Sequence, residues 1–175
     1  MSEWIIDPDH SVAAFTVRHM MVADVHGQFN KITGTINFDP ADINKSSVNL
    51  EISVDSVFTG IPKRDDHLRS QDFFYKEKYP AIIFKSTGTE RTGFNSCKIN
   101  GDLTIRGITR IVTVDVNFYG PVKSPFGETS LGFTGKLRLN REDFDMMWNE
   151  PMENGGFVAG KDAQIFIDIE ADLAS

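Results

Sequence analysis

The sequence predicts an all-β fold, an extended eight-stranded antiparallel barrel with one short helix. Eight segments alternate apolar and polar side chains with a period of two, as Val112, Val114, Val116 and Phe118 do, and this period is typical of strands with one buried face. A single connection, residues 56–80, contains residues typical of a helix. A closed barrel of about eight strands has an interior that is filled by side chains or holds one small ligand.

The predicted strands follow one another along the whole chain. They cover residues 10–19, 25–38, 47–55, 81–88, 95–106, 109–119, 129–140 and 162–173. Gly120 falls between strands, where turns favour glycine. Gly34, Gly101 and Gly135 fall inside strands, where glycine marks a bend or a close approach of two backbones. Because no repeat or linker interrupts the pattern, we expect one domain over residues 1–175.

The connection of residues 56–80 is predicted to form a short helix that covers one end of the barrel. Pro62 suits the first helical position. Asp65 and Asp66 lie early in the helix, where the positive end of the helix dipole favours acidic side chains, and Arg69 lies late. A connection of this length has room to fold over an open end of the barrel.

The composition excludes several classes of protein. The net charge of −7 leaves no basic stripe for a nucleic acid partner. No apolar run approaches the ~20 residues that span a bilayer, so we expect no stable membrane insertion. Cys97 is the only cysteine, which excludes an internal disulfide and fits a reducing compartment. Since no signal peptide is visible, we expect a cytoplasmic protein, or a periplasmic one if a leader was removed.

The motifs of catalytic, nucleotide and metal sites are not convincing. Residues 155–161 fit the phosphate-loop pattern G-x-x-x-x-G-K, but Asp162 stands where Ser or Thr binds magnesium, and a strand is predicted to follow. No nucleophile elbow is present. His10 and His19 lie nine residues apart on one predicted strand, so they face opposite sides and cannot share a metal. We expect no catalytic residue, no metal and no cofactor.

Apolar residues in the inward phase of the strands are the candidates for lining the barrel interior. They are Phe15, Val17, Ile36, Phe38, Phe84, Leu103, Val114, Val116, Phe133, Leu137, Ile167 and Ile169. If the interior holds a ligand, these side chains provide its apolar surroundings.

Four polar residues are candidates for contact with the polar end of such a ligand. His19 extends the apolar face that includes Phe15, so it is either a core histidine paired with a backbone carbonyl or a polar anchor in the interior. Arg64, Asp65 and His67 form either a solvated helix face or part of the barrel mouth. At the mouth, Arg64 could bind a phosphate or carboxylate with two hydrogen bonds, unless a neighbouring carboxylate holds it as a structural strut.

A soft apolar segment precedes the last predicted strand. Its apolar residues are Phe144, Met146, Met147, Trp148 and Met152. Methionine adapts its shape to varied apolar partners. The segment therefore either packs under its own loop, or lines a portal or a dimer contact.

Four segments, in the same order along the chain, resemble the YceI-like family, the lipocalin-like polyisoprenoid-binding proteins of bacteria. Residues 4–29, which include D-P-D-H-S, resemble the opening signature of that family. Residues 56–87 match its central pattern with R-D-D-H-L and D-F-F, residues 99–107 its next strand pair, and residues 141–144 its late R-x-D-F element. Asp145 stands where the family usually has glycine, so the turn after the seventh predicted strand is expected to differ.

The resemblance implies a lipocalin-like barrel that binds a long amphiphile, with the tail among the interior residues and the head group near His19, Arg64, Asp65 and His67. The ligand would be a polyisoprenoid, a polyisoprenoid phosphate or a fatty acid derivative, bound for storage or transport without catalysis or metal. The resemblance also implies a homodimer. Two alternatives stay open: an enzyme that uses His19 as acid or base on a bound amphiphile, and an accessory partner of a membrane redox protein.

Overall fold

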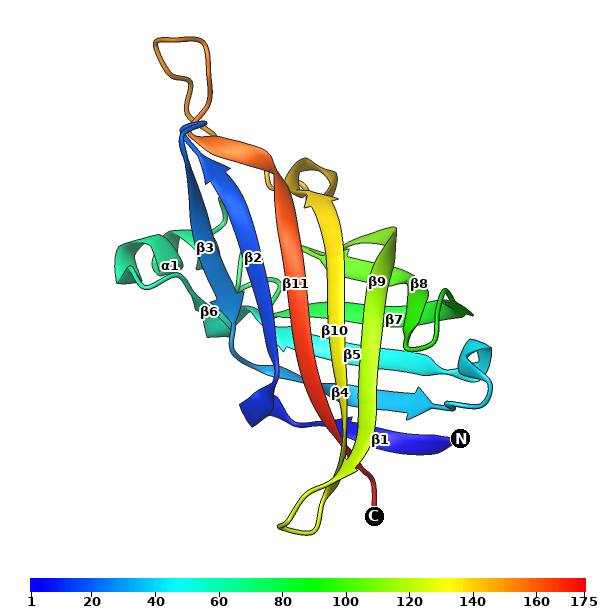
Figure 1. Ribbon diagram of the computed structural model, residues 1–175. Helices are drawn as coiled ribbons and strands as arrows, with labels where there is room; N and C mark the ends of the chain where they lie inside the picture. The colour runs from blue at the N-terminus through cyan, green and yellow to red at the C-terminus, as the bar shows by residue number, and fades with distance from the viewer.

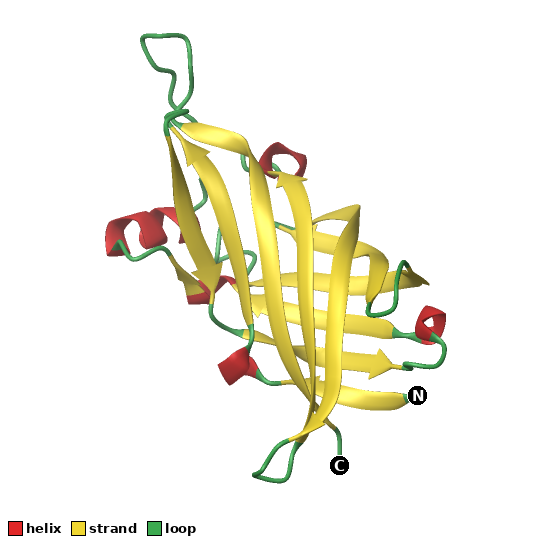
Figure 2. Ribbon diagram, viewed as in Figure 1, coloured by secondary structure: helices red, strands yellow, loops and turns green.

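The computed structural model describes residues 1–175 and consists mostly of β-strands (Figure 1, Figure 2). The strands are β1 (Ser2–Ile6), β2 (Val12–His19), β3 (Ala23–Phe29), β4 (Ile32–Phe38), β5 (Ser47–Ser53), β6 (Val57–Phe58), β7 (Ala81–Arg91), β8 (Ser96–Ile105), β9 (Ile108–Lys123), β10 (Thr129–Asn140) and β11 (Ala159–Leu173). The helices are α1 (Pro62–Arg69) and the short 3₁₀ helices η1 (Pro8–His10), η2 (Ile43–Lys45), η3 (Val54–Ser56) and η4 (Arg141–Phe144). No helix is long and apolar enough to cross a bilayer.

Eight of the strands close into an antiparallel barrel, which confirms the predicted fold class. They pair in the order β1-β4-β5-β7-β8-β9-β10-β11, and β1 pairs with β11 to close the ring. β11 serves two neighbours, because its C-terminal end pairs with β1 and its N-terminal part pairs with β2. β2, β3 and β6 therefore continue from β11 as an extension of the wall at one end of the barrel (Figure 1).

The sequence pattern does not predict β1, the strand that closes the barrel. Trp4 and Ile6 are buried and Ile5 is exposed, but so short an alternation does not distinguish a strand from a loop. The prediction that His10 shares a strand with His19 is wrong, because His10 ends η1 and β2 begins two residues later.

The single predicted strand of residues 25–38 is two strands in the structure. The break lies at Asn30 and Lys31, whose backbone N–H groups donate to the carbonyl oxygen and to the hydroxyl of Ser56 (3.2 and 3.1 Å). Lys31 also accepts a bond from the backbone N–H of Ser53 (3.0 Å). These contacts turn the chain from the β2–β3 extension into β4 of the barrel.

Two glycines inside strands lie where neighbouring residues approach closely, as predicted. Gly34 of β4 pairs with Leu50 of β5 at a φ of +148°, and a Cβ there would lie 2.2 Å from the carbonyl oxygen of Asn49. A Cβ at Gly101 of β8 would lie 2.5 Å from the ring of Phe84. The missing side chains leave room for the close strand contacts that a curved, closed sheet requires.

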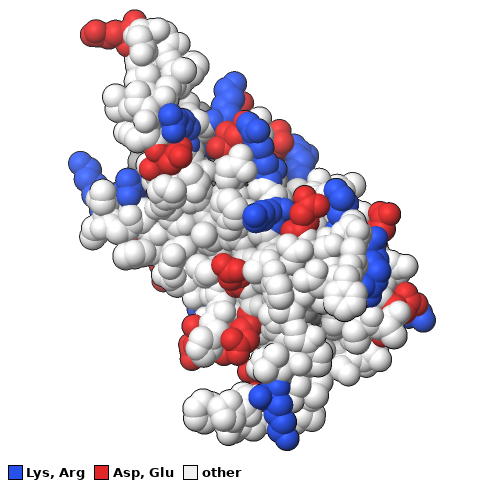
Figure 3. Space-filling view, in the orientation of Figure 1, with Lys and Arg blue, Asp and Glu red and all other residues white.

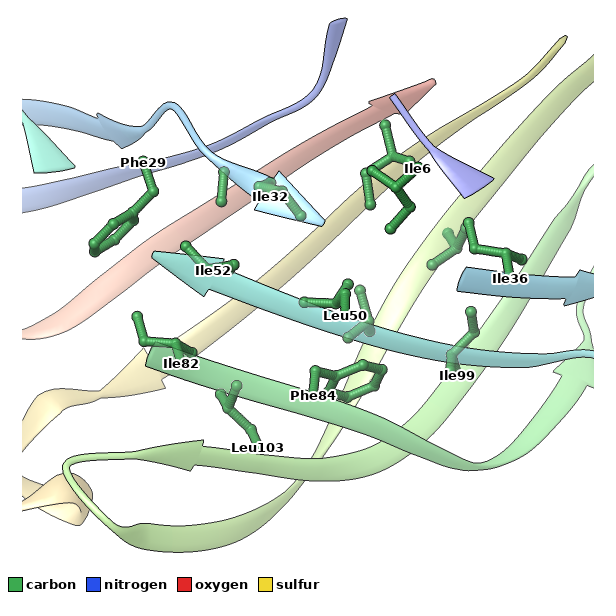
Figure 4. Packing of buried hydrophobic residues seen from close by; sticks show 14 of the residues in the cluster. Ile6, Phe29, Ile32, Ile36, Leu50, Ile52, Ile82, Phe84, Ile99 and Leu103 are labelled. Carbon is green, nitrogen blue, oxygen red and sulfur yellow. The ribbon is translucent and has the colours of Figure 1, made fainter. Parts of the chain in front are cut away.

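Apolar side chains block one end of the barrel. Figure 4 shows buried residues of β4, β5, β7 and β8 that project toward a common interior. At the end near β1, the ring centroid of Phe38 lies 5.2 Å from that of Phe118 and 5.6 Å from that of Phe133. Leu131 and Ala171 are fully buried at the same end. The interior is therefore open toward α1 and the β2–β3 extension.

Candidate functional site: an apolar cavity with a cationic mouth

A cavity of about 370 Å³ occupies the barrel interior and opens beside α1. This volume lies within the ~300–1,000 Å³ that is typical of small-molecule sites. Of the 39 residues that line the cavity, 33 are hydrophobic. The predicted interior residues among them are Phe15, Val17, Ile36, Phe84, Leu103, Val114, Val116, Phe133, Leu137, Ile167 and Ile169. For these residues, the alternation along the strands indicates the correct face.

Phe38 does not line the cavity, so its predicted place beside a ligand tail is corrected. It is the last residue of β4 and pairs with Ser2 of β1. Its ring packs on Phe118 and Phe133 at the blocked end of the barrel. The alternation predicts the inward face of Phe38 but says nothing about its depth along the barrel axis.

The polar lining of the cavity is entirely basic. Apart from one glycine, Gly135, the non-hydrophobic residues that line it are Arg18, His19, Arg64, His67 and Arg141. No carboxylate lines the cavity, although the chain carries a net charge of −7. Positive charge without a partner in apolar surroundings is stabilised by a nearby anion, so the lining favours a ligand with a negative head group.

Arg64 reaches the cavity from α1 and is held there by Thr59. Its Nε donates to the Thr59 hydroxyl (2.7 Å) and its Nη2 donates to the Thr59 carbonyl (2.8 Å). Nη1 makes no hydrogen bond within the protein, so it is free to donate to a ligand. The structure thus shows a strut, as one alternative predicted, but its partner is a threonine and not a carboxylate.

Asp65 does not line the cavity, and its predicted place beside a head group is corrected. Its side chain is buried and accepts hydrogen bonds from the backbone N–H (2.8 Å) and the hydroxyl (2.5 Å) of Thr59. Asp65 therefore fixes the first turn of α1 and, through the same threonine, the orientation of Arg64. A local pattern could not reveal this contact, because Thr59 lies outside the helix.

His67 joins α1 to the segment that follows β10. Its ring centroid lies 4.8 Å from that of Trp148 and 5.0 Å from that of Phe73, both with edge-to-face geometry. Its Nε2 lies 2.9 Å from a carboxylate oxygen of Asp72. All three rings line the cavity. The segment with Trp148 therefore lines the portal, which is one of the two alternatives that its composition allows.

Arg141 is the most buried cation of the cavity lining, with 6% of its surface exposed. Its guanidinium donates to the carbonyl oxygens of Met146 (2.7 Å), Trp148 (2.8 Å), Ala159 (3.3 Å) and Gly160 (2.7 Å). No carboxylate forms an ion pair with it, and burial lowers the pKa of the guanidinium from its ordinary value. A net positive charge therefore remains at the cavity wall.

The sequence-based prediction of head-group residues missed Arg141. A signal was present, because Arg141 continues the inward phase of β10 after Leu137 and Leu139. All three residues line the cavity. An arginine in the inward phase at the end of a barrel strand is therefore a candidate for the cavity wall.

Arg18 and His19 complete the mouth at the end of β2. Arg18 forms an exposed ion pair with Asp24 (3.2 Å). The His19 ring is half-buried and lines the cavity, and it makes no hydrogen bond within the protein. The structure therefore does not show the backbone carbonyl partner that a core histidine would have.

Asp145 adopts the backbone conformation for which the resemblance expects glycine. Its φ of 59° and ψ of 26° lie in the left-handed region, where aspartate is tolerated better than most residues. Its backbone N–H donates to the carbonyl of Glu142 (3.1 Å). The turn at the end of η4 is therefore of the type that glycine favours, despite the substitution.

One group of side chains could hold a metal ion, and it lies outside the cavity. Ligand atoms of Asp7, His10 and Glu170 all lie within 4.8 Å of one another. His10 Nδ1 lies 2.6 Å from a carboxylate oxygen of Asp7. This contact raises the pKa of His10 and lowers the pKa of Asp7. An imidazole–carboxylate pair thus accounts for two of the three groups.

Comparisons with known proteins agree with the barrel. A family model described as YceI-like domain matches residues 4–171. A UPF0312 protein of Pseudomonas syringae pv. syringae is 35% identical over 145 residues, which are 82% of this chain and 76% of that protein. A UPF0312 protein of Staphylococcus aureus is 31% identical over 175 residues, 99% of each chain.

Solved structures show the same fold. BcnA of Burkholderia cenocepacia superposes with a TM-score of 0.83 at 25% identity, over 94% of this chain and 98% of BcnA. A polyisoprenoid binding domain from Saccharophagus degradans superposes with a TM-score of 0.76 over 99% of this chain and 100% of that domain. At 14% sequence identity, this similarity shows only that the two proteins share a fold.

Proposed function

Because the chain belongs to the YceI-like family, we propose that it binds a long-chain amphiphile with an anionic head group, without chemical turnover. A polyisoprenoid phosphate is the first candidate, since four segments of the sequence resemble polyisoprenoid-binding proteins, and the Saccharophagus domain with the same fold also carries that description. The tail would lie in the barrel and the head group at the mouth. The protein would hold the amphiphile for storage or for transport.

One observation carries this proposal. The cavity lining is apolar except for a glycine and five residues with basic side chains, and it contains no carboxylate. Three of the five are arginines, which stay charged at any pH that the protein tolerates. Arg18 already pairs with Asp24, but a neutral apolar ligand would leave the charges of Arg64 and Arg141 without an anionic partner, whereas a phosphate or carboxylate would pair with them.

Tail and head group contribute in different ways. Each buried CH₂ group contributes ~0.8 kcal/mol to the binding free energy. Burial of several isoprene units against the barrel wall therefore contributes more than any single polar contact of the head group. The head group decides selectivity, because Arg64 Nη1 makes no hydrogen bond within the protein and no carboxylate forms an ion pair with Arg141. We therefore expect affinity to follow tail length, and anions to be preferred over alcohols of equal length.

The cavity does not favour the alternative of an enzyme. General acid–base catalysis needs a second titratable group in reach of the reacting atoms. No carboxylate lines the cavity beside His19, and the carboxylate of Asp72, which pairs with the other lining histidine, His67, is not part of the lining. Lipid recovered after long incubation should therefore be chemically unchanged with the wild type and with His19→Asn alike, and His19→Asn should alter only the affinity.

The experiment compares two ligands that differ only in charge, geranylgeranyl phosphate and geranylgeraniol. Titration of the wild-type protein should give the lower Kd for the phosphate. Arg64→Gln should raise the Kd of the phosphate about tenfold, as expected for the loss of a charge-assisted hydrogen bond. The Kd of the alcohol should stay within about twofold.

Lys63→Gln is the matched control, because Lys63 is exposed on the same helix, does not line the cavity and has the same charge. It should leave both affinities unchanged. Equal weakening of phosphate and alcohol by Arg64→Gln would contradict the head-group role, and failure of the wild type to bind either ligand would contradict the proposed function itself.

A further inference from the structure

Two segments beside the cavity mouth expose large apolar side chains next to each other. One is the turn between β2 and β3, and the other is the end of the loop before β11. The backbone N–H of Met20 donates to the carbonyl oxygen of Val158 (2.7 Å). A Cβ at Gly156 would lie 2.6 Å from the sulfur of Met21, so the two segments pack together. Their exposed apolar side chains, called the apolar tip below, are Met20, Met21, Val22 and Phe157.

The exposure of the apolar tip is not explained by packing within the chain. Its side chains are 44% to 75% exposed, and contiguous apolar surface of this kind marks an interaction site. Met152 lies near Met21, since a Cβ at Gly156 would be 2.9 Å from the methyl group of Met152 and 2.6 Å from the sulfur of Met21. Methionine side chains adapt to partners without a fixed shape.

The apolar tip borders the mouth of the cavity. His19, which precedes Met20, and Val158, which follows Phe157, both line the cavity. Figure 1 shows the loop before β11 projecting beyond the ends of β2 and β3. Figure 3 shows this projection mostly white, with acidic atoms at its far end. A ligand that enters the barrel from this side therefore passes the apolar tip.

The charges around the apolar tip do not form a basic patch. Arg18 pairs with Asp24 (3.2 Å) and Lys161 with Glu142 (3.6 Å). Glu153 is exposed in the projecting loop. Attraction to anionic lipids requires cations that are free to meet them, so a partner at the apolar tip is recognised through apolar contact.

We propose that the apolar tip inserts into the surface of a lipid bilayer, and that the amphiphile passes there between bilayer and barrel. This inference rests on the proposed function, because an amphiphile with a long tail resides in a bilayer before it is bound. Transfer through water would expose the tail, at a cost in free energy proportional to its apolar area. Insertion of the apolar tip at the interface opens the mouth directly to the lipid layer.

The first experiment measures binding of the ligand-free protein to phosphatidylcholine vesicles by flotation. Met21→Asp and Phe157→Asp should each weaken vesicle binding about tenfold, since each removes one apolar contact and adds a charge. Aspartate suits position 21, where the backbone φ is 63°. Addition of phosphatidylglycerol to the vesicles should not strengthen binding.

Phe126→Asp is the matched control. Phe126 is 89% exposed in the turn between β9 and β10, at the end of the molecule opposite the apolar tip (Figure 1). The same change in size and charge at that position should leave vesicle binding unchanged. All three variants replace exposed side chains and should keep the wild-type melting temperature.

The second experiment measures loading from vesicles that carry geranylgeranyl phosphate. The two variants of the apolar tip should load about tenfold more slowly than the wild type, in proportion to their weaker vesicle binding. Their Kd for the same amphiphile in detergent solution should be unchanged, because the cavity is intact.

Several results would overturn the inference. One is that both variants load as fast as the wild type. Another is that vesicle binding requires phosphatidylglycerol. A third is that both variants weaken self-association and leave vesicle binding unchanged. The last result would assign the apolar tip to a contact between two copies of the chain. Failure of the proposed function is distinct, since it would appear as absent amphiphile binding in detergent while ligand-free protein still floats with vesicles.

Discussion

Arg141 connects the two ends of the loop that borders the cavity mouth. Its guanidinium donates to Met146 and Trp148 at the start of the loop and to Ala159 and Gly160 at its end. Burial of a cation without a carboxylate is unfavourable unless hydrogen bonds compensate, and four carbonyl oxygens supply them here. The same residue therefore stabilises the loop and leaves positive charge at the cavity.

Replacement of this residue should affect both roles. Arg141→Met should destabilise the protein by about 3 kcal/mol, because it leaves carbonyl groups in the interior without donors. It should also weaken binding of geranylgeranyl phosphate. Denaturant unfolding checks the first result and titration the second. Arg138→Met, which breaks only an exposed ion pair with Asp162, should cost under about 1 kcal/mol. Equal stability of the two variants would contradict this role of Arg141.

At the scale of elements, η1 connects two strands that both pair with β11. Asp7 begins it, and its carboxylate accepts from the backbone N–H of Asp9 (2.9 Å). Ser11 ends it, and its hydroxyl accepts from the backbone N–H of Glu170 in β11 (3.2 Å). His10 pairs with Asp7 across the turn (2.6 Å). The turn therefore holds β1 and β2 in place on the same strand.

The His10–Asp7 pair should make stability depend on pH. The contact with Asp7 raises the pKa of His10 above 6.5, so its contribution is complete below 6.5 and is lost as pH rises through the folded value. The contact with His10 lowers the pKa of Asp7 below 3.8, so its contribution is present above 3.8 and is lost as pH falls through the folded value. The pair therefore stabilises the fold most between pH 3.8 and pH 6.5.

The corresponding variant is His10→Ala. Its melting temperature should fall below that of the wild type at about pH 5 and approach it at about pH 9. The effect is small, since His10 is exposed to solvent. In an Asp7→Asn background the pH-dependent part should become smaller, because Asp7 contributes most to the raised pKa of His10 while Glu170 and Asp9 still contribute. A difference of equal size at both pH values would contradict the ion pair as its cause.

At the scale of the whole molecule, the barrel separates two kinds of surface along each strand. Ile167 of β11 points inward, lines the cavity and pairs with Gly135 of β10. The next residue toward the N-terminus, Phe166, is exposed on the outer surface, where Lys136 lies over its ring. Two adjacent residues of the same strand thus face the ligand cavity and the solvent, respectively.

A carboxylate introduced at Ile167 should affect ligand binding, whereas one introduced at Phe166 should not. Ile167→Glu should abolish binding of geranylgeranyl phosphate, because a carboxylate in the apolar cavity repels the tail and the anionic head group. Phe166→Glu should leave binding unchanged. Ile167→Trp fills the cavity without a buried charge and should also reduce binding, so it separates loss of space from loss of folding. Normal binding by a folded Ile167→Glu protein would show that the assigned inward phase is wrong.

Local sequence determined most of the wall and part of the mouth. Alternation identifies the inward residues of β9 and β10, because burial of one sheet face requires the same period wherever the strand lies. The helix around Pro62 follows from residue preferences within one turn. Arg64 and His67 line the cavity, which is one of the two positions that the sequence left open for this helix, and their role toward a head group stays a prediction. The homodimer that the resemblance implies stays a prediction.

Only the tertiary structure decided the contacts between segments that lie apart in the chain. The break at Asn30 depends on Ser56, the orientation of Asp65 depends on Thr59, and the blocked end depends on Phe38 meeting Phe118. The lack of a carboxylate in the cavity lining around Arg141 is likewise a property of the assembled barrel. A period along one strand reports which face is buried, whereas depth in the barrel and the partners of a charge depend on how the strands close around it.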